Sequence, residues 1–391
     1  MEDSSCYCFD TLCVKGRKSV HSYDSTGSIS LPIFQSATYA HPELGKSTGF
    51  DYSRLSNPTR QFVEDQVAAL DGAKYGFAFS CGMAAITAFF NMLPSGSHII
   101  CSDDLYGGSI RLFNTIVKKE GSDTTFVDTS DLKNIEDALR PNTKVIFIET
   151  PGNPLMTITD IRKTAEIAHK NGAILVVDNT FLTAYYQKPL LLGADVVIQS
   201  GTKFLAGHND TLAGFVTTSS EKIAEDMTYI TKTTGAMLSP FDSWLVARGI
   251  KTLAVRMDKQ SENAAKIASF LKNAPHVKKV LYVGLPESKG YEINKGQTSG
   301  FGSMISVYVD SPETSRRVLK KIKVFQYAES LGGVESLITY PYTQTHAEIP
   351  EAERRAKGIT EELLRISVGI ENPDDLIEDL RQALEEKITA L

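Results

Sequence analysis

The fold is decided by the stretch Ala194-Asp195-Val196-Val197-Ile198-Gln199-Ser200-Gly201-Thr202-Lys203, an apolar run that ends in Ser-Gly-Thr-Lys. An earlier apolar run, Ile174-Leu175-Val176-Val177, ends in Asp178. Continuous apolar runs of this length are typical of strands that are buried on both faces of a parallel sheet. We therefore predict one strand that delivers an Asp at its carboxyl end and a second that delivers hydroxyl groups and a lysine.

This pair of strand ends suits an enzyme that uses pyridoxal 5'-phosphate (PLP). The amine of Lys203 can form a Schiff base with the aldehyde of the cofactor. Asp178 can pair with the pyridine nitrogen and keep it protonated, so that the ring withdraws electrons from the substrate. The hydroxyls of Ser200 and Thr202 can donate to the phosphate. Each feature alone is weak, because an Asp after a strand is often a turn or cap residue and Ser-x-Thr-Lys is common.

Strand and helix patterns alternate upstream of this stretch, from about Thr59 onward. We predict strands over 75–79, 98–101, 125–127 and 144–148, and helices over 61–70, 82–93, 109–119, 131–139 and 160–170. Helices between successive parallel strands form right-handed crossovers, which build an α/β layer structure. The fold class predicted for this part of the chain is therefore α/β with a mostly parallel sheet.

The pattern changes after about Arg248. We predict helices over 251–273, 312–321 and 374–387, and strands over 277–283, 304–309 and 367–370. This arrangement indicates a smaller α+β domain. The predicted organisation is thus an N-terminal arm over 1–55, a large α/β domain over 56–248 and a C-terminal α+β domain over 249–391. The arm shows little periodicity, and we expect it to wrap a partner subunit or the body of its own chain.

The composition is that of a soluble globular protein, and it excludes several classes of partner. The 391 residues are 42% hydrophobic and carry a formal net charge of −6, which argues against nucleic acid or an anionic membrane as a partner. The first residues are acidic and polar, so we expect no secretory signal. Residues 75–102 contain no Asp, Glu, Lys or Arg, but glycine, proline and serine interrupt them, so we predict no membrane span.

The five cysteines are expected to be free thiols in a reducing cytoplasm. Three of them crowd the N-terminus, and no second Cys or His pair stands nearby at the spacing of metal ligands. We therefore predict no metal site. The cysteines are Cys6, Cys8, Cys13, Cys81 and Cys101.

A second candidate for phosphate binding follows the strand at 75–79, where Ser80-Cys81-Gly82-Met83 leads into a helix. A phosphate there could accept from the free N–H groups of Gly82 and Met83 and would benefit from the helix dipole. Gly82 would let the backbone approach closely. An ordinary strand-to-helix turn is the alternative. A nucleotide-binding α/β protein is not supported, because no Gly-rich phosphate loop follows the first strand and no Walker pattern occurs.

Longer motifs spread over nearly the whole chain make it resemble the Cys/Met-metabolism (transsulfuration) family of PLP enzymes. The resemblance implies the aspartate-aminotransferase-type fold, with a large PLP-binding domain, a smaller C-terminal domain and an N-terminal arm. The motifs are specific to the family but not to one member of it. They are Asp51-Tyr52-Ser53-Arg54, Asn57-Pro58-Thr59-Arg60, Ser80-Cys81-Gly82-Met83, Asp104-Leu105-Tyr106-Gly107-Gly108, Glu149-Thr150-Pro151-Gly152-Asn153-Pro154, Val177-Asp178-Asn179-Thr180-Phe181, Ser200-Gly201-Thr202-Lys203, Glu329-Ser330-Leu331-Gly332-Gly333 and Leu364-Arg365-Ile366-Ser367-Val368-Gly369.

The resemblance implies roles for residues on the cofactor side of the site. Lys203 would be the Schiff-base lysine and the proton shuttle, and Asp178 the partner of the pyridine nitrogen. Tyr106 would stack on the ring and act as an acid or base toward the leaving group; a packed aromatic side chain is the alternative. The phosphate would be held by Ser80, Gly82, Met83, Ser200 and Thr202.

The same resemblance places two residues of the arm, Tyr52 and Arg54, at the phosphate of a neighbouring subunit. The catalytic unit would then be an obligate dimer, and the expected assembly is a homotetramer built as a dimer of dimers. The alternative is that both are plain surface residues.

On the substrate side, the resemblance implies that Arg365, with Ser330 and Asn153, binds the α-carboxylate of an amino acid. An arginine fork matches a carboxylate bidentately and would fix the Cα–H bond relative to the ring. The alternative is that Arg365 pairs with Glu361 or Glu362.

The choice of reaction depends on residues farther from Lys203. Methionine γ-lyases typically carry Cys where this chain has Gly108, and Lys-Asp where it has Lys232-Thr233, so that reaction is disfavoured. Glu329 and Arg111 stand at positions where this chain resembles cystathionine γ-lyases and γ-synthases. There they could contact the distal amino-acid end of the substrate; pairing with other protein residues is the alternative.

Cystathionine β-lyase and O-acetylhomoserine sulfhydrylase remain alternative reactions. A PLP-fold binding module without activity is opposed by the intact Lys203, Asp178 and Tyr106. The sequence leaves open β- against γ-chemistry, lyase against synthase, and the physiological substrate.

Overall fold

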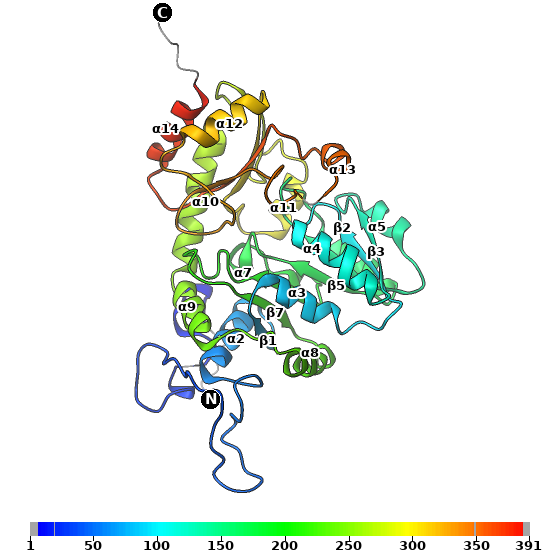
Figure 1. Ribbon diagram of the computed structural model, residues 1–391, viewed down its shortest axis with the longest axis vertical. Helices are drawn as coiled ribbons and strands as arrows, with labels where there is room; N and C mark the ends of the chain where they lie inside the picture. The colour runs from blue at the N-terminus through cyan, green and yellow to red at the C-terminus, as the bar shows by residue number, and fades with distance from the viewer. Residues whose placement is uncertain (1–6, 19, 348, 386–391) are drawn as a thin grey trace, which may run out of the picture.

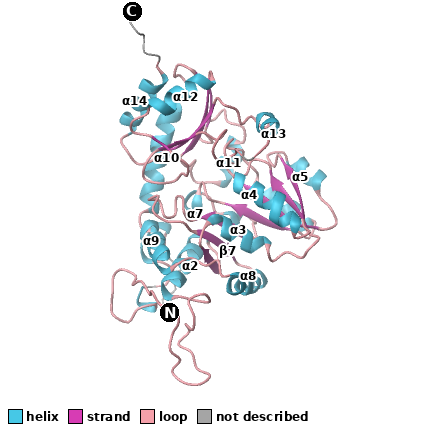
Figure 2. Ribbon diagram, viewed as in Figure 1, coloured by secondary structure: helices cyan, strands magenta, loops and turns pink. Residues whose placement is uncertain are grey.

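The structure is a computed structural model that describes residues 7–18, 20–347 and 349–385. Two sheets of different topology form the body of the molecule, and the long helix α10 (Leu253–Leu271) runs between them (Figures 1 and 2). The predicted α/β architecture with a smaller second part is confirmed. None of the described helices is long and apolar enough to cross a membrane.

The large sheet has seven strands in the order β1-β7-β6-β5-β4-β2-β3. All neighbouring pairs are parallel except those of β7, which is antiparallel to both β1 and β6. The strands are β1 (Tyr75–Phe79), β2 (His98–Ser102), β3 (Asp123–Val127), β4 (Thr143–Glu149), β5 (Ile174–Asp178), β6 (Val196–Ser200) and β7 (Gly214–Thr218).

Burial on both faces explains why the central strands are continuous apolar runs. In β5, Val176 belongs to one hydrophobic cluster, whereas Leu175 and Val177 belong to another cluster on the opposite face. Successive side chains of a strand point to opposite faces, so each residue meets a separate layer of helices. The helices of this part are α2 (Pro58–Asp71), α3 (Gly82–Phe90), α4 (Gly107–Leu112), the π-helix η3 (Phe113–Val117), α5 (Leu132–Ala138), α6 (Ile161–Lys170), α7 (Thr183–Tyr186), η4 (Pro189–Leu192), α8 (Glu221–Thr234) and α9 (Pro240–Ile250).

The predicted strands and helices up to β6 are present, with ends that shift by a few residues. The analysis of the sequence did not predict β7, α8 or α9. β7 is the short run Gly-Phe-Val-Thr-Thr. Its two threonines interrupt the apolar pattern, so the sequence does not indicate that the strand is buried. All five of its residues are buried, because β7 lies between two other strands and its Thr217 hydroxyl donates to the buried Asp71.

The second sheet has five strands in the order β10-β11-β12-β9-β8 and is mainly antiparallel. Its strands are β8 (Val277–Leu281), β9 (Met304–Val309), β10 (Gln326–Tyr327), β11 (Leu337–Thr339) and β12 (Leu363–Ser367). The helices that follow α10 are α11 (Tyr291–Gln297), α12 (Pro312–Lys321), α13 (Glu351–Ala356) and α14 (Pro373–Leu384).

The strand predicted over 367–370 is wrong. The strand at this place is β12, which ends at Ser367 and pairs with β9 and β11. Beyond that residue the backbone leaves the ladder: Val368 N donates to Ser303 O, and Ile370 N donates to Val334 O. The apolar residues after Ser367 are therefore extended, but they bond to loops.

Helix α10 belongs to the cores of both parts. Leu253 and Met257 pack in the hydrophobic cluster that includes Phe204 of the large sheet's part. Ile267 and Leu271 pack in the cluster of the second sheet. The boundary predicted near residue 248 thus falls just before a helix that both parts share, and the domain limits stay predictions.

The N-terminal arm is only partly extended. Helix α1 (Phe9–Lys15) packs on the body, where Cys13 is buried and its carbonyl accepts from Gln66 Nε2 at 2.7 Å. After the short η2 (Val20–Ser22), the chain forms loops that project from the body, drawn in blue in Figure 1. Ile29 and Leu44 are exposed on these loops. Met1–Cys6 lie outside the described residues.

Candidate active site

The ends of three adjacent strands bring the predicted polar residues to one edge of the large sheet. Glu149 at the end of β4 is in register with Asp178 at the end of β5. β6 runs parallel to β5 and ends at Ser200, so Lys203 follows at the same edge. The carboxyl edge of such a sheet is where α/β proteins bind ligands.

A chain of hydrogen bonds joins Lys203 to the second sheet. Lys203 Nζ donates to Ser330 Oγ at 2.7 Å. Ser330 O in turn accepts from Arg365 Nη2 at 3.0 Å. Ser330 has a φ of +85°, a strained value for a residue with a side chain. This conformation lets one residue meet the lysine with its hydroxyl and the arginine with its carbonyl.

The environment of Lys203 makes its amine less basic than usual. Burial lowers the pKa of Lys203 to about 8, and the positive charge of Arg365 adds to this effect. The negative charge of Glu329 opposes it. A substantial fraction of the amine is therefore neutral near neutral pH, the state in which an amine acts as a nucleophile or base.

Asp178 is held in one orientation by the residue two positions later. Its Oδ1 accepts from Thr180 N at 2.9 Å, and Thr180 Oγ1 accepts from Ser200 N at 2.9 Å. Burial raises the pKa of Asp178 to about 6, although the bonds from Thr180 lower it. Thr180 therefore links the ends of β5 and β6.

The predicted phosphate ligands form a close-packed cradle. A methyl group added at Gly82 would lie 3.0 Å from Ser200 Cβ, and one added at Gly214 would lie 2.2 Å from Cys81 O. The backbone next to the start of α3 therefore leaves no room for a side chain at residue 214, and a side chain at residue 82 would press against Ser200. The first N–H groups of a helix have no partner inside it, so this cradle presents donors beside the Ser200 hydroxyl.

Two further residues of the cradle, Thr202 and Ser80, make contacts with the protein backbone. Thr202 Oγ1 accepts from Ala213 N at 3.0 Å, and Ser80 N donates to Ala236 O at 2.9 Å.

Tyr106 lies at the start of α4 and is 42% exposed. Its N–H donates to Glu149 Oε2 at 3.0 Å, which ties the tyrosine to the end of β4. A methyl group added at Gly108 would lie 2.5 Å from Tyr106 Cε1 and 3.1 Å from Met83 Sδ. The absence of a side chain at residue 108 thus allows the ring its present position, and a Cys there would require the ring to move.

Arg365 is buried and is held by protein groups. Its Nη1 donates to Asn153 Oδ1 at 2.8 Å, and its Nη2 donates to Thr339 Oγ1 at 3.1 Å as well as to Ser330. Its Nε is buried and has no hydrogen-bond partner in the described part of the chain. Burial lowers the pKa of Arg365 to about 10, which leaves it cationic at neutral pH.

The alternative pairing of Arg365 with a nearby glutamate is not the arrangement found. Glu361 forms ion pairs with Arg316 and Arg355 instead.

The other predicted residues are less closely associated with Lys203 within one chain. Glu329 is exposed, and its charge acts on both Lys203 and Arg365. Arg111 is exposed on α4. Arg54 donates to Lys232 O and lies over the ring of Tyr52, with 5.4 Å between its Cζ and the ring centroid. Tyr52 is 44% exposed.

Three residues of the site make contacts that the sequence did not predict, although Glu149 was expected at the end of a strand. Thr180 orients Asp178, Thr339 holds Arg365, and Glu149 holds the backbone of Tyr106. Glu149 is buried beside Asp178, and burial and that neighbouring charge raise its pKa. Its place at a strand end was visible in the sequence, whereas the contact between Thr339 and Arg365 depends on the register of β11 on β12.

Cys8, Cys13, Cys81 and Cys101 are free thiols, and Cys6 lies outside the described residues. Cys81 caps α3, where its sulfur accepts from Ala84 N. Within residues 7–18, 20–347 and 349–385, no group of three or more His, Cys, Asp or Glu side chains could hold a metal ion.

The donors and acceptors of this site fit PLP. Asp178 is a half-buried carboxylate that has no cationic partner among the described residues, and it suits a protonated pyridine nitrogen. A glycine cradle at a helix start suits a phosphate. An amine with a lowered pKa suits an aldehyde, and an unpartnered guanidinium nitrogen suits an added carboxylate.

Comparison with known proteins identifies the family. Residues 10–385 match the family model "Cys/Met metabolism PLP-dependent enzyme". The chain is 50% identical over 362 residues to cystathionine γ-lyase of Bacillus subtilis (strain 168), covering 93% of this chain and 96% of that protein. It is 46% identical over 363 residues to cystathionine β-lyase of Lactococcus lactis subsp. cremoris (strain MG1363), with 93% and 96% covered.

A solved structure agrees with these matches. Cystathionine γ-synthase from Xanthomonas oryzae pv. oryzae, in complex with aminoacrylate and cysteine, superposes with a TM-score of 0.94 at 37% identity, covering 97% of this chain and 98% of that one. The predicted family, its PLP cofactor and its carbon–sulfur chemistry are thereby confirmed. The chain belongs to the Cys/Met-metabolism family of PLP-dependent transsulfuration enzymes.

Proposed function

We propose that this enzyme acts on cystathionine or an O-acyl-homoserine and breaks or replaces the bond at Cγ, as a cystathionine γ-lyase or γ-synthase. The observation that carries the proposal is the connected chain from Lys203 through Ser330 to Arg365, with the Glu329 carboxylate acting on both cations. These contacts support the roles proposed for Lys203 as the base, Arg365 as the carboxylate receptor and Glu329 as the ammonium receptor.

The cofactor is held by residues of the large sheet. When bound, PLP supplies an aldehyde for covalent attachment and a ring that withdraws electrons from Cα of the amino acid. Lys203 provides the attachment point, and Asp178, oriented by Thr180, holds a proton on the pyridine nitrogen. Ser80, Gly82, Met83, Ser200 and Thr202, at the start of α3 and in the cradle, would hold the phosphate of PLP.

The substrate is oriented by residues around the second sheet. Arg365 Nε and its neighbouring N–H groups bind the α-carboxylate, while Asn153 and Thr339 prevent the guanidinium from turning. This orientation turns the Cα–H bond toward Lys203 Nζ, which removes the proton in its neutral form. The Ser330 hydroxyl, 2.7 Å from Nζ, keeps the amine near Cα.

Reaction at Cγ needs a second proton transfer, from Cβ, and a proton for the leaving group. Lys203 can serve both carbons because its side chain is flexible and only one hydrogen bond holds its amine. Tyr106, which is anchored by Glu149 and partly exposed, is positioned at the start of α4 to exchange a proton with the departing sulfur or oxygen. Glu329 attracts the distal ammonium of a cystathionine-sized substrate, and Arg111 attracts its carboxylate.

A cystathionine β-lyase is the second candidate, because a relative of that name is 46% identical over 93% of this chain. O-Acetylhomoserine sulfhydrylase activity would use the same residues with sulfide as the incoming nucleophile. Methionine γ-lyase is disfavoured, since Gly108 leaves room for the present Tyr106 ring and a Cys would not.

We propose an assembly of four chains, a dimer of dimers, in which Tyr52 and Arg54 complete the phosphate site of a neighbouring subunit. Within its own chain Arg54 is bonded to Lys232 O, and the loops that carry it project from the body. The proposal predicts complementation: mixing inactive Arg54→Ala and Lys203→Ala chains should restore about a quarter of wild-type activity, since half of the dimers carry one intact site. No recovery after the chains exchange would contradict shared sites.

We place the enzyme in the cytoplasm, a location supported by its four described free thiols. The measurement is cell fractionation with an antibody against the native chain; recovery in an oxidising compartment would contradict this location.

Product analysis tests the reaction. Purified holoenzyme is supplied with cystathionine alone, with O-acyl-homoserine and cysteine, and with O-acyl-homoserine and sulfide. Release of 2-oxobutyrate from cystathionine identifies a γ-lyase, and formation of cystathionine from cysteine identifies a γ-synthase. Pyruvate from cystathionine as the main product would contradict the proposal and identify a β-lyase.

A further inference from the structure

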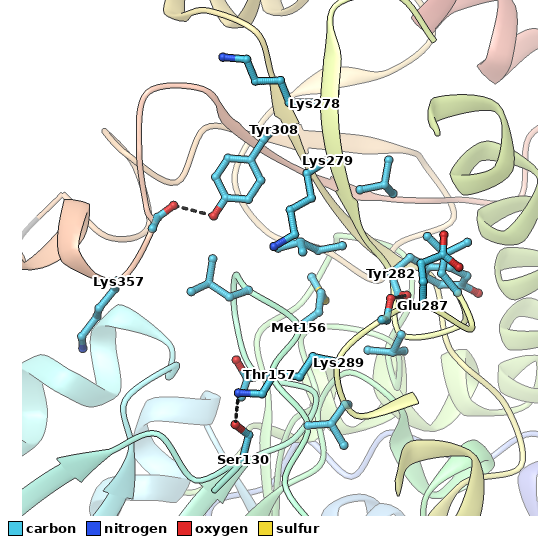
Figure 3. Close-up of a pocket in the computed structure, with 18 of the residues that line it drawn as sticks. Ser130, Met156, Thr157, Lys278, Lys279, Tyr282, Glu287, Lys289, Tyr308 and Lys357 are labelled. Carbon is cyan, nitrogen blue, oxygen red and sulfur yellow. Dashed lines mark hydrogen bonds between the residues drawn. The ribbon is translucent and has the colours of Figure 1, made fainter. Parts of the chain in front are cut away.

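A second cavity lies outside the proposed active site. Its volume is about 780 Å³, within the range of small-molecule sites. One wall comes from residues 155–158, just after β4, and the other from β8 and from residues 355–358 (Figure 3). Lys203, Asp178, Tyr106 and Arg365 do not line it.

The residues that line this cavity carry a net positive charge, whereas the whole chain carries a net negative charge. Among the residues that line it, two are acidic, Asp128 and Glu287, whereas six are cationic. The chain as a whole has a formal net charge of −6. The six cationic residues are Lys272, Lys278, Lys279, Lys289, Arg355 and Lys357.

Five of these six cations already have protein partners. Lys289 Nζ donates to Ser130 Oγ at 2.8 Å, and Lys272 pairs with Glu287. Arg355 pairs with Glu351 and Glu361. The remaining two donate to backbone carbonyl groups: Lys278 to Asp310 O at 2.8 Å, and Lys357 to Asp103 O at 3.1 Å.

Lys279 is different from the other five. Its backbone belongs to the β8–β9 ladder, but among the residues that the structure describes its ammonium group has no hydrogen bond or ion pair. In Figure 3 its side chain reaches from β8 into the space between Tyr308 and Met156, whereas Lys278, its neighbour in sequence, points away. Lys279 is exposed to solvent, and an ammonium group that lines a cavity can form a charge-assisted hydrogen bond with an anionic oxygen.

The rest of the lining is suited to an organic body. Met156, Ile158, Leu285 and the ring of Tyr308 also line the cavity. The Tyr308 hydroxyl is occupied, because it donates to Gly358 O at 2.7 Å, so the ring offers its apolar surface. A ligand with one anionic end and an apolar or aromatic body would satisfy both parts of the lining.

We propose that this cavity binds small organic oxyanions, with the carboxylate or phosphate at Lys279 and the apolar body against Met156, Ile158 and Tyr308. The proposal does not depend on which transsulfuration reaction the enzyme catalyses.

The test is calorimetry of the holoenzyme with three probes, namely phenyl phosphate, benzoate and inorganic phosphate. The variant Lys279→Met removes the charge and keeps the length of the side chain, Lys279→Arg keeps the charge, and Lys278→Met is the matched control on the same strand. Heat that is common to all four proteins belongs to other anion sites, such as that of Arg365. The cofactor absorbance of each protein reports that it is folded and loaded.

We expect wild type, Lys279→Arg and Lys278→Met to bind an aromatic probe alike, and Lys279→Met to bind it about tenfold more weakly, the loss of roughly one charge-assisted hydrogen bond. A preference for phenyl phosphate or for benzoate identifies the anionic group, and weaker binding of inorganic phosphate shows the contribution of the apolar lining. Equal affinity of wild type and Lys279→Met for every probe overturns the proposal, as does an equal loss in Lys278→Met.

Discussion

The two halves of the proposed active site are built in different ways. On the cofactor side, Asp178, Ser200 and Lys203 follow adjacent strands of one sheet, and the topology of that sheet alone brings them together. On the substrate side, Arg365 lies on β12 of the second sheet and reaches Asn153, which follows β4 of the first sheet. The cofactor half is thus fixed by one layer, whereas the substrate half depends on how two layers are joined.

The largest effect should come from the cofactor half. Lys203→Ala removes both the attachment point and the proposed base, so turnover should fall by about 10⁴-fold or more, and the absorbance band of the lysine-bound cofactor should disappear. Spectroscopy and product formation measure the two losses. The control is Lys144→Ala, which removes an exposed lysine from the start of β4. A retained band in Lys203→Ala would show that another amine holds the cofactor.

A paired experiment separates the two halves by kinetics. Asp178→Asn should lower kcat on the order of 100-fold with little change in KM, because it weakens electron withdrawal in the transition state. Arg365→Lys should retain the cofactor band and raise KM, by about 100-fold, since lysine cannot reproduce the fork. Steady-state kinetics and the cofactor spectrum are measured for both. Similar changes in kcat and KM in the two variants would contradict the division of the site into a cofactor half and a substrate half.

The pH dependence of cofactor binding should reflect the environment of Lys203. Only the neutral amine attacks an aldehyde, and burial lowers the pKa of this amine from its usual value to about 8. The rate at which apoprotein takes up PLP should therefore rise by about tenfold per pH unit below pH 8 and level off above it. Stopped-flow absorbance measures the rate. A rise that continues toward pH 10 would show that the amine is not buried in this way.

The smallest effect should come from the outer edge of the substrate half. Glu329→Gln removes a charge that is exposed to solvent, so KM for cystathionine should rise by only a few-fold. A substrate without the distal ammonium should be affected less. Comparing cystathionine with O-acyl-homoserine in the two proteins measures the difference. Equal changes in KM for both substrates would show that Glu329 does not contact the distal end of the substrate.

The same contrast explains what could be predicted from the sequence. Apolar runs that end in Asp178 and Ser200 predicted strands. Because neighbouring strand ends of a parallel sheet lie close together, the cofactor half could be predicted from the sequence. On the substrate side, only the resemblance to the family grouped Asn153 and Ser330 with Arg365, and Thr339 was missed because its contact depends on the register of β11 against β12. β7 was missed because burial between two strands does not require apolar residues where threonine hydroxyls find buried acceptors.

Helix α10 has a mechanical consequence for the union of these halves. Its 19 residues span roughly 28 Å, with one end set in the core behind Lys203 and the other in the core behind Arg365. A rigid rod anchored at both ends transmits any tilt of the second sheet to the first. Arg256 in this helix donates to Phe204 O at 2.8 Å, next to Lys203, so a substitution that tilts α10 should change the distance between the lysine and the arginine.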